Sequence, residues 1–125
     1  MHRIAPDDCC LTIVIAAFNE AEALPVLQPR IATALALAEA GGLEARVLYV
    51  DDGSRDATWD VLRGFAAADS RVALLRLSRN FGKEAALTAG LDRVERGAAF
   101  ILDADGQDPP ELLPRFVAKW REGFD

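Results

Sequence analysis

The stretch "RVLYVDDGSRD" (residues 46–56) joins an apolar run to an acidic turn. Its first residues are bulky or β-branched, and the run is too short for a helix, so it predicts a strand at 46–50. The residues that follow favour a turn, and either Ser54 or Asp56 can cap a helix that begins just beyond it. A strand that passes through a turn into a helix is the building unit of an α/β fold.

The same unit occurs four times along the chain. Strand-length apolar runs also occur at 11–17, 72–77 and 98–102, and they mostly lack the alternation of a strand with one wet face. Apolar residues at helical spacing follow the last three strands, at Trp59, Leu62 and Phe65, at Leu87, Leu91 and Val94, and at Leu113, Phe116, Val117 and Trp120. The pattern predicts a three-layer, Rossmann-like parallel sheet with helices on both faces and the strand order 3-2-1-4.

The helix boundaries are less regular than the strands. Pro25 and Pro29 both lie early in the first helical segment, so we expect its regular part at about 29–40, after a loop or an irregular first turn. The glycine pair at 41–42 and Gly97 each follow a helical run. They predict the left-handed residue that commonly ends a helix.

The composition is that of one ordinary globular domain, residues 1–125, with 51% apolar and 27% charged residues. The net charge of −6 argues against binding to the phosphate backbone of nucleic acids. The only cysteines, Cys9 and Cys10, are neighbours that rarely bridge each other, which favours a reducing, cytoplasmic compartment. No apolar run approaches the roughly 20 residues that a membrane span needs, so we expect this chain itself to be soluble.

The chemically unusual residues lie where the strands end. The four strand ends are "AAFNE" (16–20), "DDGSRD" (51–56), "SRNFGK" (78–83) and "DADGQD" (103–108). Parallel sheets bind ligands at the carboxyl ends of their strands, near the point where the strand order reverses. In the order 3-2-1-4, the acidic ends of strands two, one and four are neighbours, so we expect their side chains to converge on one site.

The acids after the last strand suit a divalent cation. Asp103 and Asp105 are spaced so that both carboxylates can turn toward one point, where they would repel each other if left unpaired. Mg²⁺ or Mn²⁺ relieves that repulsion, because it prefers carboxylate, amide and phosphate oxygens, and Gln107 offers an amide oxygen nearby. Each motif alone is also ordinary turn chemistry. A cation site is favoured over simple turns because three strand ends of the same sheet are acidic.

Other phosphate-site patterns fit poorly. No G-x-G-x-x-G follows a strand, and the Gly-Lys at 82–83 has Leu77 and Glu84 where a P-loop needs glycine and a hydroxyl residue. A receiver domain or a D-x-D phosphatase would carry its acids after the first strand, whereas the aspartate pair here follows the second.

Taken together, "IAAFNE", "VDDGSRDAT", "SRNFGKEAAL" and "DADGQDPPE" resemble family 2 glycosyltransferases of the GT-A fold. The resemblance runs from about residue 11 to the end and is closest to the polyprenyl-phosphate (dolichol- or undecaprenyl-phosphate) glycosyltransferases. The chain departs from the family pattern at Ala16, where Pro is common, at Phe18, where Tyr is common, and at Gly106, where Leu is usual. We expect these changes to tune base recognition and loop stiffness rather than abolish binding.

The resemblance implies a role for particular residues. The implied nucleotide-sugar contacts are Ala16, Phe18, Glu20, Val50, Asp52, Lys83, Asp103, Ala104 and Asp105. Of these, Val50 and Asp52 would contact the base or the ribose. Asp103 and Asp105 would be catalytic, and Asp105 with Gln107 would ligate Mg²⁺ or Mn²⁺. We expect Asp51 to support the turn rather than touch a ligand.

The implied reaction is metal-dependent, inverting transfer of a sugar from a nucleoside-diphosphate sugar to a polyprenyl phosphate, at the cytoplasmic face of the membrane. Relatives with these motifs continue well past the equivalent of Asp125. We therefore expect this chain to be the N-terminal, donor-binding half of a GT-A domain, without the acceptor half or any transmembrane helices. Two alternatives stay open: a non-catalytic nucleotide-sugar binding module, and a GT-A enzyme with a saccharide acceptor.

Overall fold

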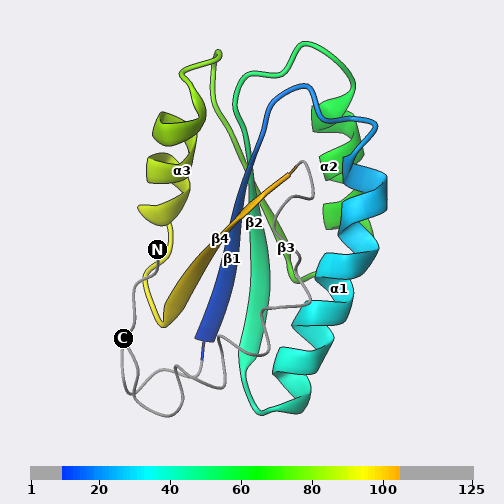
Figure 1. The fold of residues 1–125 in the computed structure, drawn as a ribbon, viewed down its shortest axis with the longest axis vertical. Helices are drawn as coiled ribbons and strands as arrows, with labels where there is room; N and C mark the ends of the chain where they lie inside the picture. Colours follow the sequence, from blue (N-terminus) through cyan, green and yellow to red (C-terminus); the bar gives the residue numbers. More distant parts are fainter. Residues whose placement is uncertain (1–9, 105–125) are drawn as a thin grey trace.

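The computed structural model describes residues 10–104, which form one parallel four-stranded sheet with helices on both faces (Figure 1). Its strands are β1 (Cys10–Ala17), β2 (Glu44–Asp51), β3 (Val72–Arg76) and β4 (Ala98–Asp103). They lie in the order β3-β2-β1-β4, and each neighbouring pair is parallel. The fold class and strand order predicted from the sequence are confirmed. The expected last helix, with Leu113 and Trp120, lies outside the described residues.

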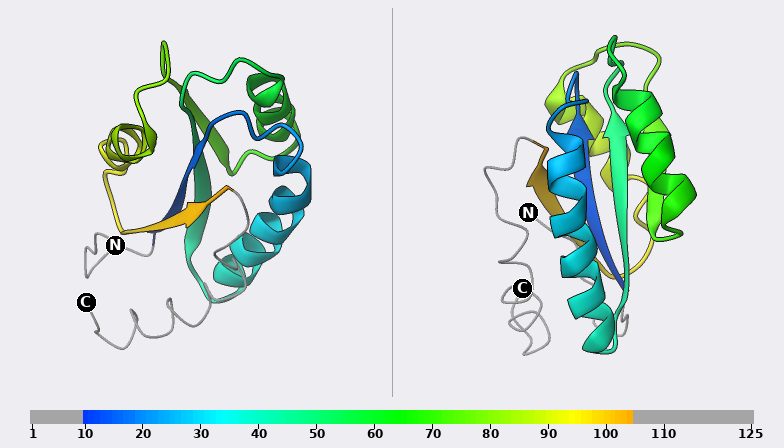
Figure 2. Two further views of the ribbon diagram at one scale, coloured as in Figure 1. Left: turned by 45° about the horizontal axis from the view of Figure 1, so that its top comes forward. Right: turned by 90° about the vertical axis from the view of Figure 1, so that its right-hand side faces the viewer.

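The helices cover the two faces of the sheet unequally. The helices α1 (Leu24–Ala40) and α2 (Thr58–Ala68) lie on one face, and α3 (Lys83–Leu91) lies on the other (Figure 2). The strand order explains this, because β1, β2 and β3 step in one direction and the chain then returns past them to β4. Right-handed crossovers in opposite directions place their helices on opposite faces. None of the described helices combines the length and the apolar character that crossing a bilayer requires.

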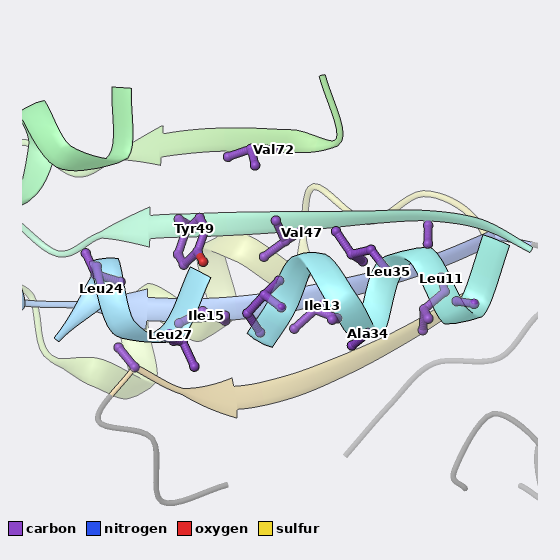
Figure 3. Packing of buried hydrophobic residues seen from close by; sticks show 14 of the residues in the cluster. Leu11, Ile13, Ile15, Leu24, Leu27, Ala34, Leu35, Val47, Tyr49 and Val72 are labelled. Carbon is purple, nitrogen blue, oxygen red and sulfur yellow. The ribbon is translucent and has the colours of Figure 1, made fainter. Parts of the chain in front are cut away.

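Two cores lie on the two faces of the sheet. The larger one, beneath α1 and α2 (Figure 3), includes Leu11, Ile13, Ile15, Val47, Tyr49, Leu24, Leu27 and Leu35. The smaller one, beneath α3, contains Val14, Leu48, Val50, Ala86, Val94 and Ala99. Strands with both faces covered have no reason to alternate apolar and polar residues, which accounts for their sequence pattern.

The first helix begins at Leu24, so the expected start at about residue 29 is wrong. Pro25 lies in the first turn, where its missing N–H costs no hydrogen bond. Pro29 lies inside the helix, but Leu24 and Leu27 are buried against the sheet on the same apolar face as the later turns. Tertiary packing therefore outweighs the unfavourable helix propensity of proline.

The two glycine signals have different outcomes. Gly42 has a φ of 93° at the end of α1, and its N–H donates to the carbonyl of Glu39 at 3.0 Å, as predicted. Gly97 is left-handed as predicted, with a φ of 77°, but it does not end a helix, because α3 ends at Leu91 and Gly97 directly precedes β4. A Cβ atom at Gly97 would lie 2.0 Å from the carbonyl oxygen of Cys10, so this position is glycine because β1 passes so close.

An ion pair closes the connection between α2 and β3, at the amino end of the sheet. The carboxylate of Asp69 accepts hydrogen bonds from the backbone N–H, the Nε and the Nη2 of Arg71, at 2.9, 3.0 and 2.8 Å. These hydrogen bonds hold the pKa of Asp69 below its ordinary value of 3.8, and those from the guanidinium contribute most.

We expect Asp69→Asn to lower the free energy of unfolding by about 1 kcal/mol at pH 7, because it removes charge-assisted hydrogen bonds from a mostly covered pair. Because the pKa of Asp69 is lower in the folded state, the ionised carboxylate contributes its full stability above about pH 4. This contribution is lost as the pH falls through the pKa of the folded state. The difference between wild type and variant should therefore shrink below pH 4. Urea unfolding at pH 7 and at pH 3 measures it, and a difference that stays constant would contradict the ion pair.

Candidate functional site

A cavity of about 320 Å³ opens at the carboxyl ends of the strands and the start of α3. Its lining residues are Ala16, Ala17, Phe18, Glu20, Asp52, Asn80, Lys83, Asp103 and Ala104. Among the described residues that were expected to contact a nucleotide sugar, all line this cavity except Val50. The cavity also lies where β1 and β4 are neighbours, the point at which the chain reverses its direction across the sheet.

Val50 lies in the core beneath α3 instead of at the cavity. Its side chain is fully buried, and a Cβ atom at Gly90 of α3 would lie 2.9 Å from its Cγ2. Side chains alternate along a strand, so Val50 faces α3, its neighbour Asp51 faces the opposite way, and Asp52 follows the strand end. The side chain of Val50 is therefore not available for the expected contact with a base or ribose.

The turn after β2 is held by Asp51 and Gly53. The Oδ1 of Asp51 accepts the N–H of Ser54 at 3.0 Å, which confirms the expected turn-supporting role. Gly53 has a φ of 71°, and a Cβ atom there would lie 2.2 Å from the carbonyl carbon of Arg79. The loops that follow β2 and β3 therefore touch backbone to backbone.

The loop after β1 is bound to the loop after β2 through Asn19. Its backbone has a φ of 54°, its N–H donates to the Oγ of Ser54, and its Oδ1 accepts the N–H of Arg55, both at 2.9 Å. Ser54 therefore serves the β1 loop instead of capping α2. These bonds fix the backbone next to Phe18, which lines the cavity and is 41% exposed.

Asp56 is the capping candidate that contacts α2. Its carboxylate accepts the N–H and the hydroxyl of Thr58, the first residue of the helix, and also the N–H of Ala21. These hydrogen bonds hold the pKa of Asp56 below its ordinary value, and the bond from the Thr58 hydroxyl contributes most. The Oγ1 of Thr58 in turn accepts the N–H of Glu20 at 2.8 Å, so the start of α2 also positions a cavity-lining residue.

Asp52 connects the sheet to the loop between β3 and α3. It is 2% exposed, and its carboxylate accepts the N–H of Phe81 at 2.8 Å, the N–H of Gly82 at 3.1 Å and the Nδ2 of Asn80 at 3.0 Å. Asn80 was not among the expected contacts, although it lines the cavity. Its position inside the "SRNFGK" strand end was the one available signal.

An ion pair crosses the cavity between Lys83, the first residue of α3, and Asp103, the last residue of β4. The carboxylate of Asp103 is mostly covered, whereas the side chain of Lys83 is 59% exposed. Within residues 10–104, no three His, Cys, Asp or Glu side chains lie close enough together to hold a metal ion. The expected ligands Asp105 and Gln107 lie outside the described residues, so the metal site stays a prediction.

Comparisons with known proteins agree with the order of the motifs. The model of the family "Glycosyl transferase family 2" matches residues 12–125. The bactoprenol glucosyl transferase of Shigella phage SfX is 39% identical over 115 residues, which are 92% of this chain and 37% of that protein. The undecaprenyl-phosphate 4-deoxy-4-formamido-L-arabinose transferase of Salmonella paratyphi B is 41% identical over 116 residues, 92% of this chain and 35% of that protein. The chain therefore spans about a third of the length of these relatives.

Solved structures share the arrangement of strands and helices. S. aureus TarS residues 1–349, in complex with UDP-GlcNAc, superpose with a TM-score of 0.72 at 19% identity, covering 90% of this chain and 31% of that one. The mannosyltransferase PcManGT from Pyrobaculum calidifontis, in complex with GDP-Man and Mn²⁺, has a TM-score of 0.66 at 22% identity, covering 82% of this chain and 30% of that one. At these identities the likeness shows the fold alone.

Proposed function

Because the chain belongs to glycosyl transferase family 2, we propose that it forms the donor site of an enzyme that transfers a sugar from a nucleoside-diphosphate sugar to a polyprenyl phosphate, at the cytoplasmic face of a membrane. The observation that carries the proposal is the cavity at the strand ends, where Lys83 and Asp103 meet. The lipid-phosphate acceptor is supported by the names of the relatives, which are bactoprenol and undecaprenyl-phosphate sugar transferases.

Lys83 supplies the positive charge for the donor diphosphate. Its ammonium group reaches the cavity from the first turn of α3, where the partial positive charge of the helix terminus adds to its own. Without ligand, this charge is balanced by the carboxylate of Asp103. A diphosphate carries more negative charge than one carboxylate, so it competes effectively for Lys83, and Asp103 is then released toward the nucleotide sugar.

A divalent cation, Mg²⁺ or Mn²⁺, would when bound stabilise the negative charge of the departing diphosphate as a Lewis acid. Asp105 and Gln107 are the residues that would hold it, with carboxylate and amide oxygens of the kind such cations prefer. The PcManGT complex, which shares the fold, holds Mn²⁺ together with GDP-Man. Because Asp103 is paired with Lys83, we assign it a contact with the nucleotide sugar rather than with the metal ion.

The lipid phosphate needs no strong base. Its oxygen is already anionic near neutral pH, so it attacks the anomeric carbon directly while the bond from that carbon to the diphosphate oxygen breaks. Attack opposite the leaving group inverts the configuration at the anomeric carbon.

We expect Lys83→Ala to weaken the binding of UDP or GDP by about 10- to 100-fold, since a hydrogen bond to a charged group contributes about 1.5–3 kcal/mol. Isothermal titration calorimetry with both nucleotides measures it, in the presence of Mn²⁺ and again with a chelator. Arg46→Ala is the matched control, because it removes one exposed positive charge from β2 outside the cavity. Equal affinities for wild type and Lys83→Ala would count against the proposed donor site.

A further inference from the structure

We propose that Arg76, the last residue of β3, is a positioning residue for the donor site, although it does not line the cavity. Its guanidinium compensates the buried charge of Asp51, and Asp51 holds the turn that presents Asp52 to the cavity. The inference rests on the proposed donor site and deepens it, because it names a residue that sets nucleotide affinity without touching the nucleotide.

The carboxylate of Asp51 is buried with one of its oxygens unsatisfied. The side chain is 0% exposed, and its Oδ1 accepts the N–H of Ser54 at 3.0 Å. Among the described residues, no hydrogen-bond donor reaches its Oδ2. A buried carboxylate is costly in free energy unless further hydrogen bonds or a positive charge compensate it. Asp51 therefore depends on a cation close to its Oδ2.

Arg76 is the cation that approaches this oxygen. The two residues are partners in the register of β2 and β3, and the Nε of Arg76 lies 3.9 Å from the Oδ2 of Asp51. This distance is too long for a hydrogen bond but within the range of an ion pair. The side chain of Arg76 is 52% exposed, so water still solvates its charge, whereas the side chain of Asp51 has no exposed surface. Loss of Arg76 would therefore leave a buried carboxylate uncompensated.

Trp59 holds the guanidinium in this place. The Cζ of Arg76 lies 5.0 Å from the centroid of the Trp59 ring, which is a cation–π contact. Trp59 is the second residue of α2, and it packs against the larger core. Arg76 therefore contacts both the end of β2 and the first turn of α2, the two elements that the turn after Asp51 connects.

The turn held by Asp51 leads to two residues that line the cavity. The Oδ1 of Asp51 fixes the N–H of Ser54, and the Oγ of Ser54 accepts the N–H of Asn19 at 2.9 Å. Asp52 lies inside this turn, Phe18 directly precedes Asn19, and both Asp52 and Phe18 line the cavity. A movement of the Asp51 carboxylate would therefore change the site from the β2 side and from the β1 side.

The test compares Arg76→Met, Arg76→Lys and the double variant Asp51→Asn/Arg76→Met with the wild type. Hydrogen exchange of the Ser54 amide, measured by NMR in the ligand-free chain, reports on the turn. Calorimetry with UDP and with GDP, at a temperature at which every variant is folded, reports on the site. In Arg76→Met we expect about 10-fold faster exchange at Ser54 and about 10-fold weaker nucleotide binding, because residues in contact couple by an amount of this order.

Two variants should recover what Arg76→Met loses. Arg76→Lys should keep most of the Ser54 protection and of the affinity, because it keeps the positive charge. The double variant should recover part of both, because the amide at position 51 has no charge to compensate and its oxygen can still accept the N–H of Ser54. A merely structural loss would not be reversed by a second substitution of this kind.

Arg63→Met is the matched control. The Nη1 of Arg63 lies 4.0 Å from the Oδ1 of Asp60, nearly the distance of the Arg76 pair, but these two side chains are 67% and 79% exposed. The control therefore removes a positive charge and an ion pair without leaving a buried charge, and it should match wild type in affinity and in Ser54 exchange. If Arg76→Met does not fold, Arg76→Gln replaces it. Its amide can donate to Asp51 but carries no charge, so it should show both losses at a smaller size.

Three results would overturn the proposal. Wild-type affinity in Arg76→Met would mean that the site does not need this charge. Weaker binding with a protected Ser54 amide would mean that Arg76 acts on the nucleotide without the turn. A double variant no better than Arg76→Met would mean that Arg76 serves by packing on Trp59 rather than by compensating Asp51. If the wild-type chain binds neither nucleotide, the proposed donor site fails, whereas the exchange at Ser54 still decides whether Arg76 holds the turn.

Discussion

Gly53→Ala is expected to destabilise the chain by about 2–5 kcal/mol and to weaken nucleotide binding at the same time. The left-handed backbone at this position, with a φ of 71°, costs a non-glycine residue about 1–2 kcal/mol. The new Cβ atom would also lie 2.2 Å from the carbonyl carbon of Arg79 and 2.4 Å from the nitrogen of Asn80. These are backbone atoms, which cannot rotate away, so the two loops must separate, at a cost of about 1–3 kcal/mol.

Urea unfolding of wild type and variant measures the loss. Gly64→Ala is the matched control, because Gly64 lies inside α2 and a Cβ atom there would meet nothing within 4 Å. That substitution should stabilise the chain by about 0.5–1 kcal/mol, the difference in helix propensity between alanine and glycine. A Gly53→Ala variant as stable as wild type would contradict the close contact between the β2–α2 and β3–α3 loops.

The loss in Gly53→Ala is a large fraction of the 5–15 kcal/mol that typically stabilises a domain, so part of the population would unfold well below the wild-type melting temperature. Its effect on binding follows from the neighbouring Asp52, whose hydrogen bonds to Asn80, Phe81 and Gly82 cross the same loop contact. Nucleotide affinity measured below the melting temperature should therefore fall even for the folded fraction.

The arrangement of the sheet could be predicted because it depends on repeated, local signals. Each strand, such as 46–50, is apolar over its whole length and is followed by a turn and a helical spacing, and the handedness of the crossovers then sets which face each helix covers. The cavity could be predicted for the same reason, since the carboxyl ends of parallel strands share one edge. The start of α1 could not, because packing of Leu24 and Leu27 on the sheet outweighs the two prolines.

Long-range hydrogen bonds are what the sequence did not reveal. Asn80 and Asp52 are far apart in the chain, and no local pattern indicates that the amide of one meets the carboxylate of the other. The position of Val50 was missed for a different reason. Its place beside the aspartate pair suggested the cavity, whereas the alternation along β2 turns its side chain beneath α3. Proximity to a motif in sequence does not tell which face of the sheet a side chain occupies.

Asp105→Ala is expected to abolish the Mn²⁺-dependent part of nucleoside-diphosphate binding and to leave the fold intact. Asp105 is the charged member of the proposed ligand pair, and the cation it holds would also bind the diphosphate. Changes to residues that only support a metal ligand cost about 10–100-fold in affinity, so loss of a ligand itself should cost about 100-fold or more. Asp105→Asn is the sharper variant, because it keeps the shape of the side chain and removes one charge.

Calorimetry with UDP and GDP, in the presence of Mn²⁺ and again with a chelator, separates the contributions of Lys83 and of the metal ion to nucleotide affinity. Lys83→Ala should lose affinity under both conditions, since its ammonium group acts on the phosphates directly, whereas Asp105→Asn should lose only the gain that Mn²⁺ provides. Asp92→Ala, which removes an exposed carboxylate just after α3, should behave as wild type in both. If the Asp105→Asn variant keeps the full Mn²⁺-dependent gain, the metal is held elsewhere, and the acidic end of β4 serves the nucleotide sugar through Asp103 alone.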